Sequence, residues 1–345
     1  MQNQLQLNFK QIKNLISNSK NICIVTHFNP DGDAIGSSLG LYHILLEMGK
    51  VVNVVTPNEY PEYLIWLPAN HNIVKYSLQK EKTHGIINST NLFICIDFNE
   101  LKRTGDLFEI LGKNRVKKIL IDHHPNPENI FDVQISDISV SSTAELVYET
   151  IIQCGFEQFI SLNAAICLFT GLLTDTISFS VNCSNPRTFE IAAKLLSFGI
   201  DKEEIHRKVF DNFSANRMRL LGYTLGKKMV ILPEFGTAYM WLTNDELKDF
   251  NFQMGDSEGF VNYPLSIKGV NFAALFMERK DYIKISFRSR RNIPVNKIIS
   301  THFSGGGHKN AAGGEEYKLN MEETIKKFVS ILPQYAEILK PSYNL

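Results

Sequence analysis

Residues 92–97 read LFICID and residues 118–122 read KILID, and in both stretches an apolar run ends in a carboxylate. A third run, ICIVT at residues 22–26, is followed by the polar turn segment HFNPDGD. Runs that are apolar at consecutive positions are typical of strands buried on both faces, as in parallel sheets. Helical patterns lie between the runs, for example over residues 34–48, so we expect an α/β fold with a helix-covered parallel sheet.

The length of 345 residues is enough for two domains, each with its own core. Residues 1–185 carry the alternating strands and helices. Residues 186–226 have a helical pattern, with Pro186 suited to a first helical position and Gly199 to a helix end. Residues 227–345 contain β-like runs joined by turns. We therefore expect a helical linker between the first domain and a smaller, mixed α/β second domain.

Composition limits the classes of partner. The 36 Lys and Arg residues balance 36 Asp and Glu residues, which argues against coating of long DNA or of an anionic membrane by bulk charge. The five cysteines form no C-x-x-C pair, as expected in a reducing cytoplasm, and offer no zinc site. The N-terminus lacks the pattern of a signal peptide, and no apolar run approaches the roughly 18 residues of a membrane span. We expect a soluble cytoplasmic protein.

Carboxylates and imidazoles cluster after predicted strands and at the end of a predicted helix in the first domain. They are His27, Asp31 and Asp33; Asp97; Asp122, His123 and His124; and Asp175. In open parallel sheets, ligands bind beyond the carboxyl ends of the strands, so these groups can converge. Crowded carboxylates repel one another unless a cation lies between them. The mixture of ligands suits Mn²⁺ better than Zn²⁺, and it suffices for two ions bridged by a carboxylate such as Asp97.

Each group also has an ordinary structural explanation. The alternatives are a turn at Asp31 and Gly32 with Asp33 as a helix cap, loop starts at Asp97 and Asp122, a surface loop at His123 and His124, and an Asx-turn at Asp175. No single group is decisive. Their occurrence in this order favours one shared site over four unrelated turns.

A glycine-rich stretch, SGGGHKNAAG at residues 304–313, stands out in the second domain. Consecutive glycines let backbone N–H groups approach an anion, and His308 and Lys309 add donors. Other basic residues lie nearby, at Lys284, Arg288, Arg290, Arg291 and Lys297. A phosphate-binding loop is favoured over a passive flexible loop before a helix, whereas we expect Arg290 and Arg291 to form a solvated hairpin tip.

The ordered motifs H-x-x-x-D-x-D, D, D-H-H, D and G-G-G-H resemble those of the DHH phosphoesterase superfamily. The resemblance is strongest to the branch with a C-terminal DHH-associated domain, typified by bacterial nano-RNases that also hydrolyse 3′-phosphoadenosine-5′-phosphate (pAp). It runs from about Asn21 through nearly all of the chain. One departure is Phe303-Ser304, where the family often has a fourth glycine.

The resemblance implies two Mn²⁺ ions, with Mg²⁺ or Co²⁺ as substitutes. The implied ligands are His27, Asp31 and Asp97 for one ion and Asp33, Asp97, His123 and Asp175 for the other. Asp122 would orient His123, and His124 would face the scissile phosphate. The implied substrate contacts are Arg103, Arg288, Ser289, Gly306, Gly307 and His308.

The expected activity is Mn²⁺-dependent hydrolysis of short 5′-phosphorylated oligoribonucleotides, and of pAp, by a monomer or homodimer. A phosphodiesterase for linear or cyclic signalling dinucleotides would share the same core and is the nearest alternative. A processive single-strand DNA exonuclease needs an added domain, and an inorganic pyrophosphatase lacks the G-G-G-H domain. A non-catalytic nucleotide sensor is disfavoured because no ligand of the implied set is missing.

Overall fold

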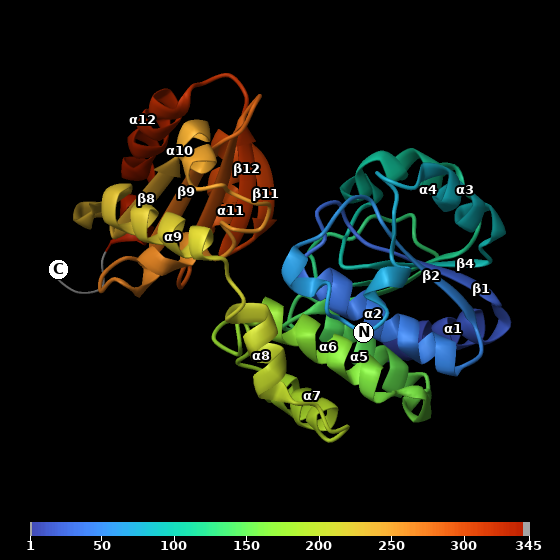
Figure 1. The fold of residues 1–345 in the computed structure, drawn as a ribbon. Coiled ribbons are helices and arrows are strands. Elements are labelled where there is room, and N and C mark those ends of the chain that lie inside the picture. Colours follow the sequence, from blue (N-terminus) through green and yellow to red (C-terminus); the bar gives the residue numbers. More distant parts are fainter. Residues whose placement is uncertain (1, 341–345) are drawn as a thin grey trace. The chain divides into compact units, whose positions relative to one another are not determined.

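The structure is a computed structural model, and it describes residues 2–340. The chain divides into two compact units, one up to Asn212 and the other from Phe213 onward (Figure 1). Among the described helices, none is both long and apolar enough to cross a membrane.

The first unit contains a six-stranded sheet in the order β3-β2-β1-β4-β5-β6, in which all neighbours are parallel. Its strands are β1 (Asn21–Val25), β2 (Val51–Thr56), β3 (Val74–Lys75), β4 (Leu92–Ile96), β5 (Lys118–Asp122) and β6 (Val133–Ser136). The strand order reverses direction between β1 and β4, and such a switch point is where open α/β sheets bind ligands. The predicted α/β fold with a parallel sheet is confirmed.

Helices cover both faces of this sheet. They are α1 (Gln2–Asn18), α2 (Gly32–Glu47), α3 (Lys80–Ser89), α4 (Phe108–Lys113), α5 (Thr143–Gln153), α6 (Leu162–Asp175), α7 (Pro186–Leu196) and α8 (Lys202–Phe210). Ile22 and Ile24 pack into the core that contains α2, α5 and α6, whereas Cys23 and Val25 pack toward α3 and α4 (Figure 1). Burial on both faces explains why the strand sequences are apolar at consecutive positions.

The three helices of residues 186–226 are divided between the two units. Ile191 of α7 and Ile205 of α8 are buried in the core of the first unit. Leu220, from α9 (Ala215–Lys227), is buried in the second unit. The chain therefore passes from one unit to the other within the segment that the sequence analysis assigns to the linker.

The second unit contains a mixed sheet in the order β11-β12-β10-β9-β8-β7, with only β8 and β9 parallel among these described pairs. Its strands are β7 (Met229–Leu232), β8 (Thr237–Leu242), β9 (Phe272–Glu278), β10 (Ile283–Ser289), β11 (Ser304–His308) and β12 (Ala311–Glu316). Its remaining helices are α10 (Asn244–Asp249), α11 (Val295–His302), α12 (Met321–Ile331) and α13 (Ala336–Leu339).

Side chains of the second sheet contribute to two cores. Phe276 and Phe287 join Phe328 of α12 in one core. Met240 and Leu275 pack with Leu220 of α9 in the other. The buried residues of this second core include none from β10, β11 or β12 in the described part of the chain.

The glycine-rich stretch is not a loop, so that expectation is wrong. Residues 304–308 form the edge strand β11, whose backbone pairs with β12 in antiparallel register. An added Cβ at Gly305 would lie 2.3 Å from the Gly313 carbonyl oxygen, and one at Gly314 would lie 2.8 Å from Ile299 of α11. These two glycines are therefore needed for close packing between strands and against α11.

Candidate metal centre

The carboxylates and imidazoles singled out in the first domain meet at the carboxyl ends of β1, β4 and β5. His27 lies shortly after β1, Asp97 directly follows β4, Asp122 ends β5, and Asp175 ends α6. Because β1 and β4 are neighbours in the sheet, residues far apart in sequence come together at the switch point.

His27, Asp31 and Asp97 form one candidate ligand group, with donor atoms within 4.8 Å of one another. His27 Nε2 lies 3.5 Å from an Asp97 carboxylate oxygen, and its Nδ1 lies 2.9 Å from the carbonyl oxygen of Phe28. Donation from Nδ1 to that carbonyl leaves Nε2 as the ligand atom. Burial lowers the pKa of His27, but the hydrogen bond to Asp97 and the charges of Asp31 and Asp97 raise it above its ordinary value.

Asp33, His123 and Asp175 form a second group of the same size. His123 Nε2 lies 3.5 Å from an Asp175 oxygen and 3.6 Å from an Asp97 oxygen. The second distance connects this group to the first through Asp97. The structure therefore brings together all six residues expected to be metal ligands.

Asp33, in the first turn of α2, is buried against the first turn of α5. Its carboxylate accepts hydrogen bonds from the backbone N–H of Thr143 at 2.6 Å and of Ala144 at 2.9 Å, and from the Ser37 hydroxyl at 3.0 Å. Burial and the nearby charges of Asp97, Asp175 and Asp31 nevertheless raise the pKa of Asp33 well above its usual range. A cation at this position would relieve the repulsion.

Asp97 is in the opposite electrostatic situation. Burial raises its pKa, but the hydrogen bond from His27 and the charges of His124, His123 and His27 hold the pKa well below its usual range. Its backbone lies in the left-handed region with φ of 66°, which costs a non-glycine residue roughly 1–3 kcal/mol. The fold thus maintains a strained, ionised carboxylate at the centre of the cluster.

Asp122 is paired differently from the expectation. Its carboxylate lies 2.7 Å from His124 Nδ1, whereas the sequence analysis assigns it to His123. The His124 ring is thereby oriented by a fully buried carboxylate. The second oxygen, Asp122 Oδ2, is buried and has no hydrogen-bond partner among residues 2–340.

The helix cap at the start of α2 also differs from the structural alternative given for these residues, which has Asp33 as the cap. It is Asp31, not Asp33, that caps α2, because its side chain accepts hydrogen bonds from the backbone N–H groups of Asp33 and Ala34 at 3.1 Å each. Although Asp31 caps the helix, its carboxylate still has an oxygen within 4.8 Å of the ligand atoms of His27 and Asp97. Arg103 lies beside this group, since its charge acts on the His27 pKa and its carbonyl oxygen accepts from Phe28 N–H at 2.6 Å.

The donor set fits divalent ions. It combines hard carboxylate oxygens with imidazole nitrogens, and most of its residues are buried. Beside it, Asp122 has one buried oxygen without a hydrogen-bond partner in the described residues. Such mixed sets suit Mn²⁺ and Mg²⁺, and the absence of cysteine from the described groups disfavours soft-metal sites.

Residues expected to contact substrate lie on different faces of β10 and β11. Register pairs place Arg288, Ala311 and His308 side by side, and Gly306 beside Gly313, on one face of the sheet. We call this the glycine face and define it by Arg288, Gly306, His308, Ala311 and Gly313. An added Cβ at Gly306 would meet no atom within 4 Å.

Ser289 and Gly307 do not share the glycine face. The Ser289 hydroxyl is buried, donates to the carbonyl oxygen of Ile293 at 2.8 Å and accepts from the Asn310 amide at 2.8 Å. An added Cβ at Gly307 would lie 2.7 Å from the Ala311 carbonyl oxygen. Both residues therefore have structural roles here, and their contact with substrate stays a prediction.

Comparison with known proteins agrees with both units. Residues 21–172 match the profile of the DHH family, N-terminal domain, and residues 235–337 match the DHHA1 domain. The chain belongs to the DHH family of phosphoesterases. This confirms the resemblance inferred from the motifs.

Relatives align with this DHH protein over almost its entire length. It is 28% identical to the bifunctional oligoribonuclease and PAP phosphatase NrnA of Bacillus subtilis, over 88% of this chain and 92% of that protein. The cyclic-di-AMP phosphodiesterase PdeA of Listeria monocytogenes is 25% identical, over 94% of this chain and 49% of that protein. A crystal structure of an exopolyphosphatase-related protein from Bacteroides fragilis superposes with a TM-score of 0.93 at 42% identity, covering 97% of this chain and 98% of that chain.

Thr143 is a residue of this DHH protein that sequence reasoning missed. Its N–H binds Asp33, and its hydroxyl donates to Asp97 at 2.8 Å, so one residue positions a carboxylate of each ligand group. The only sequence signal is its place next to Ser142, the N-cap of α5.

Thr143→Val keeps the volume and the N–H but removes the hydroxyl. We expect divalent-ion affinity, measured by calorimetric titration, to fall about 10- to 100-fold, as for other residues that orient metal ligands. Thr150→Val is the matched control, because Thr150 is a buried residue of the same helix whose hydroxyl has no partner within the described chain. Equal affinities in the two variants would contradict the role assigned to Thr143.

Proposed function

We propose that this protein is a Mn²⁺-dependent phosphodiesterase that cleaves short 5′-phosphorylated oligoribonucleotides and also removes the 3′-phosphate of pAp. The observation that carries the proposal is the complete set of carboxylates and imidazoles around the buried Asp97. The similarity to NrnA, which is named as an oligoribonuclease and PAP phosphatase, supports the substrate class.

In this proposal His27, Asp31 and Asp97 hold one ion, while Asp33, Asp97, His123 and Asp175 hold the other, with Mg²⁺ or Co²⁺ as substitutes for Mn²⁺. Such ions, when bound, supply Lewis acidity toward phosphoryl oxygens and lower the pKa of water.

His124 is proposed to face the scissile phosphate. The Asp122 carboxylate accepts from Nδ1 and directs Nε2 to the reacting group, where it stabilises negative charge or donates a proton to the leaving oxygen. Arg103, beside His27, adds positive charge for the substrate phosphate.

The glycine face is proposed to hold the remainder of the nucleotide. Arg288 and His308 supply cationic or neutral donors, and Gly306 lets a base or sugar approach the backbone because a Cβ there would meet no atom. Arg288 also donates to the Phe287 carbonyl oxygen at 2.9 Å, which fixes one guanidinium nitrogen.

We expect Arg288→Gln to raise KM for a 5′-phosphorylated dinucleotide about tenfold or more, because it removes a charge-assisted hydrogen bond to phosphate. Bound metal should be unchanged, because the six proposed ligands, from His27 to Asp175, all lie in the first unit. Steady-state kinetics together with metal analysis separate the two effects. Loss of bound metal in Arg288→Gln would contradict the assignment of this arginine to substrate binding.

The experiment that tests the proposed function measures AMP release from 5′-phosphorylated diadenylate with Mn²⁺, run in parallel with pAp and cyclic di-AMP. Rapid release from the linear dinucleotide and from pAp is expected. Preferential turnover of cyclic di-AMP would favour the second candidate, a signalling-dinucleotide phosphodiesterase, which the similarity to PdeA supports. Binding of all three without turnover, with metal bound, would indicate a nucleotide sensor and contradict the proposal.

A further inference from the structure

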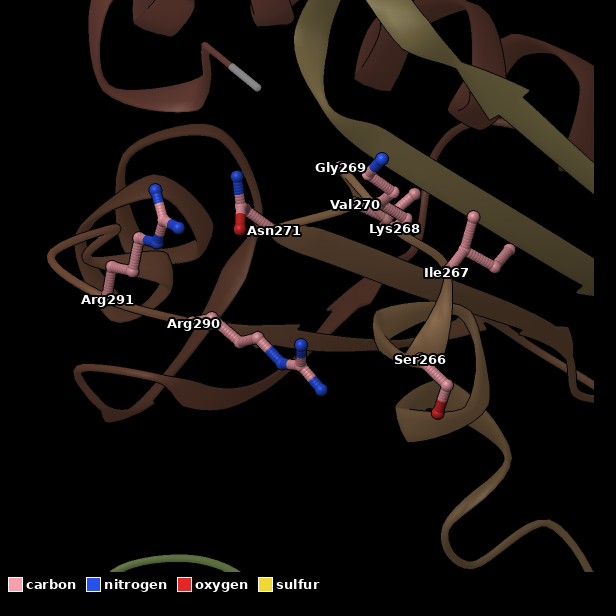
Figure 2. Close-up of a pocket in the computed structure, with 8 residues that line it drawn as sticks. All are labelled: Ser266, Ile267, Lys268, Gly269, Val270, Asn271, Arg290 and Arg291. Carbon is pink, nitrogen blue, oxygen red and sulfur yellow. The ribbon is translucent and has the colours of Figure 1, made fainter. Parts of the chain in front are cut away.

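A pocket of about 200 Å³ in the second unit is lined by none of the residues assigned above to metal or substrate. Figure 2 shows that it is lined by two neighbouring segments, residues 266–271 before β9 and the pair Arg290 and Arg291 after β10. Its volume is several times the roughly 30 Å³ that one water occupies in the liquid, so a phosphate group and its hydrating waters fit.

Three cations surround this pocket, which we call the basic pocket: Lys268, Arg290 and Arg291. All three side chains are exposed, and none forms an ion pair with a carboxylate in residues 2–340. The chain as a whole has zero formal net charge, so three uncompensated cations around one hollow are a local concentration of positive charge.

The pocket also contains a side-chain amide, that of Asn271. The Asn271 residue is 7% exposed, and its side chain makes no hydrogen bond to the residues that the structure describes, so the amide is available to a ligand in the pocket. Its NH₂ group is a neutral donor that complements three cations in binding an anion's oxygens.

The backbone around the pocket is held in place. Arg290 N–H donates to the Asn271 carbonyl oxygen at 2.9 Å, which joins the two lining segments. The Asn310 amide donates to the Arg291 carbonyl oxygen at 3.0 Å. Arg291 has φ of 60°, a left-handed conformation that is strained for arginine and that this hydrogen bond helps to maintain. The two arginines are exposed, as expected from sequence, but they lie in a turn that leads into α11 and not at a hairpin tip.

We propose that the basic pocket is a second binding site of this protein, specific for a phosphate group. Planar guanidinium groups and an amide match phosphate oxygens, and an ammonium adds charge.

Two sources of that phosphate share this chemistry. One is a further phosphodiester of a bound oligonucleotide, since Arg290 lies two residues beyond Arg288 and Asn271 precedes the strand paired with it. The other is a free phosphate-bearing small molecule. The oligonucleotide source rests on the proposed function, whereas phosphate binding itself does not.

Binding is tested by NMR on the isotope-labelled full chain with Mg²⁺, titrated with inorganic phosphate against chloride at equal ionic strength. We expect saturable shifts of the Asn271 side-chain amide and of the backbone amides of residues 268–271 and 290–291. The double variant Arg290→Gln/Arg291→Gln should weaken this binding at least about tenfold.

The control removes two cations from the opposite end of the sheet, as Lys280→Gln/Lys318→Gln. Both lysines are exposed and lie next to the β9–β10 turn or after β12. This control should bind phosphate like the wild type. No saturable shift at the basic pocket, or equal binding by both double variants, would overturn the proposal.

Kinetics distinguish the two sources. For 5′-phosphorylated oligoadenylates of two and five nucleotides, a loss of about tenfold in kcat/KM by Arg290→Gln/Arg291→Gln on the longer substrate alone assigns the pocket to substrate. Unchanged kinetics on both, with phosphate binding lost, assigns it to a free phosphate-bearing molecule. Failure of the wild type to cleave either substrate would contradict the proposed function and leave the NMR result valid.

Discussion

Asp97→Asn should abolish phosphoester hydrolysis, with a loss of at least about 10³-fold in kcat, and should lower the amount of bound divalent metal. The reason is geometric: Asp97 oxygens lie 3.5 Å from His27, 3.6 Å from His123 and 3.7 Å from His124. Rate assays with Mn²⁺ and elemental analysis of the purified variant measure the two effects.

Asp106→Asn is the matched control, since Asp106 is an exposed carboxylate in the segment that follows Asp97. It loses the same charge outside the cluster and should retain wild-type activity and metal content. A fully active Asp97→Asn protein would refute the metal assignment. A folded variant with full metal content and no activity would restrict Asp97 to a role in catalysis.

Removing divalent ions with a chelator should eliminate activity and lower the melting temperature by about 10 °C, and adding Mn²⁺ should restore both. One ion at 100 times its dissociation constant stabilises the folded state by about 2.7 kcal/mol, and each kcal/mol shifts the melting temperature by roughly 2–4 °C in a unit of this size. Differential scanning calorimetry with and without Mn²⁺ measures the shift. A shift that persists undiminished in Asp97→Asn would indicate binding elsewhere.

The increase in melting temperature that Mn²⁺ produces should be larger at pH 8 than at pH 6. The pKa values of Asp33 and His27 are raised in the fold, so each contributes stability below its unfolded pKa that is lost as pH rises through its folded pKa. Asp97, with a lowered pKa, contributes stability above the ordinary aspartate pKa and loses it only in acid. The metal-free protein is therefore less stable at pH 8, where deprotonated ligands also bind ions best. An equal increase in melting temperature at both pH values would contradict this pH dependence of stability and metal binding.

Much of the first unit could be predicted because its signals are local. The strand at residues 118–122 matches its prediction, and Pro186 begins α7 as expected. The convergence of the candidate ligands could also be predicted, since parallel strands bring their carboxyl ends to one edge of the sheet.

Other features depend on contacts that the sequence does not display. A polar N-terminal stretch forms helix α1, because Phe9, Ile12 and Ile16 are spaced to bury one face. The glycines of β11 suggested a loop, whereas strand pairing with β12 determines their conformation.

Side-chain partners were the least predictable part of the site. Ser289 follows Arg288 in sequence, yet alternation along β10 turns its hydroxyl to Ile293 and Asn310. Asp122 pairs with His124 and not with the adjacent His123 because of the orientation of the imidazole rings, and residue spacing does not predict that orientation.

The ribosome makes the chain from its N-terminus, so the ligand set is incomplete until Asp175 has been synthesised. The candidate ligands begin at His27 and end at the last residue of α6, so they span about half of the polypeptide. Asp33 is bound by the first N–H groups of α5, which are made more than one hundred residues later. A nascent chain still shorter than this has the early carboxylates without the partners that orient them. Ion binding is therefore a property of the completed unit, and a truncated translation product would lack it.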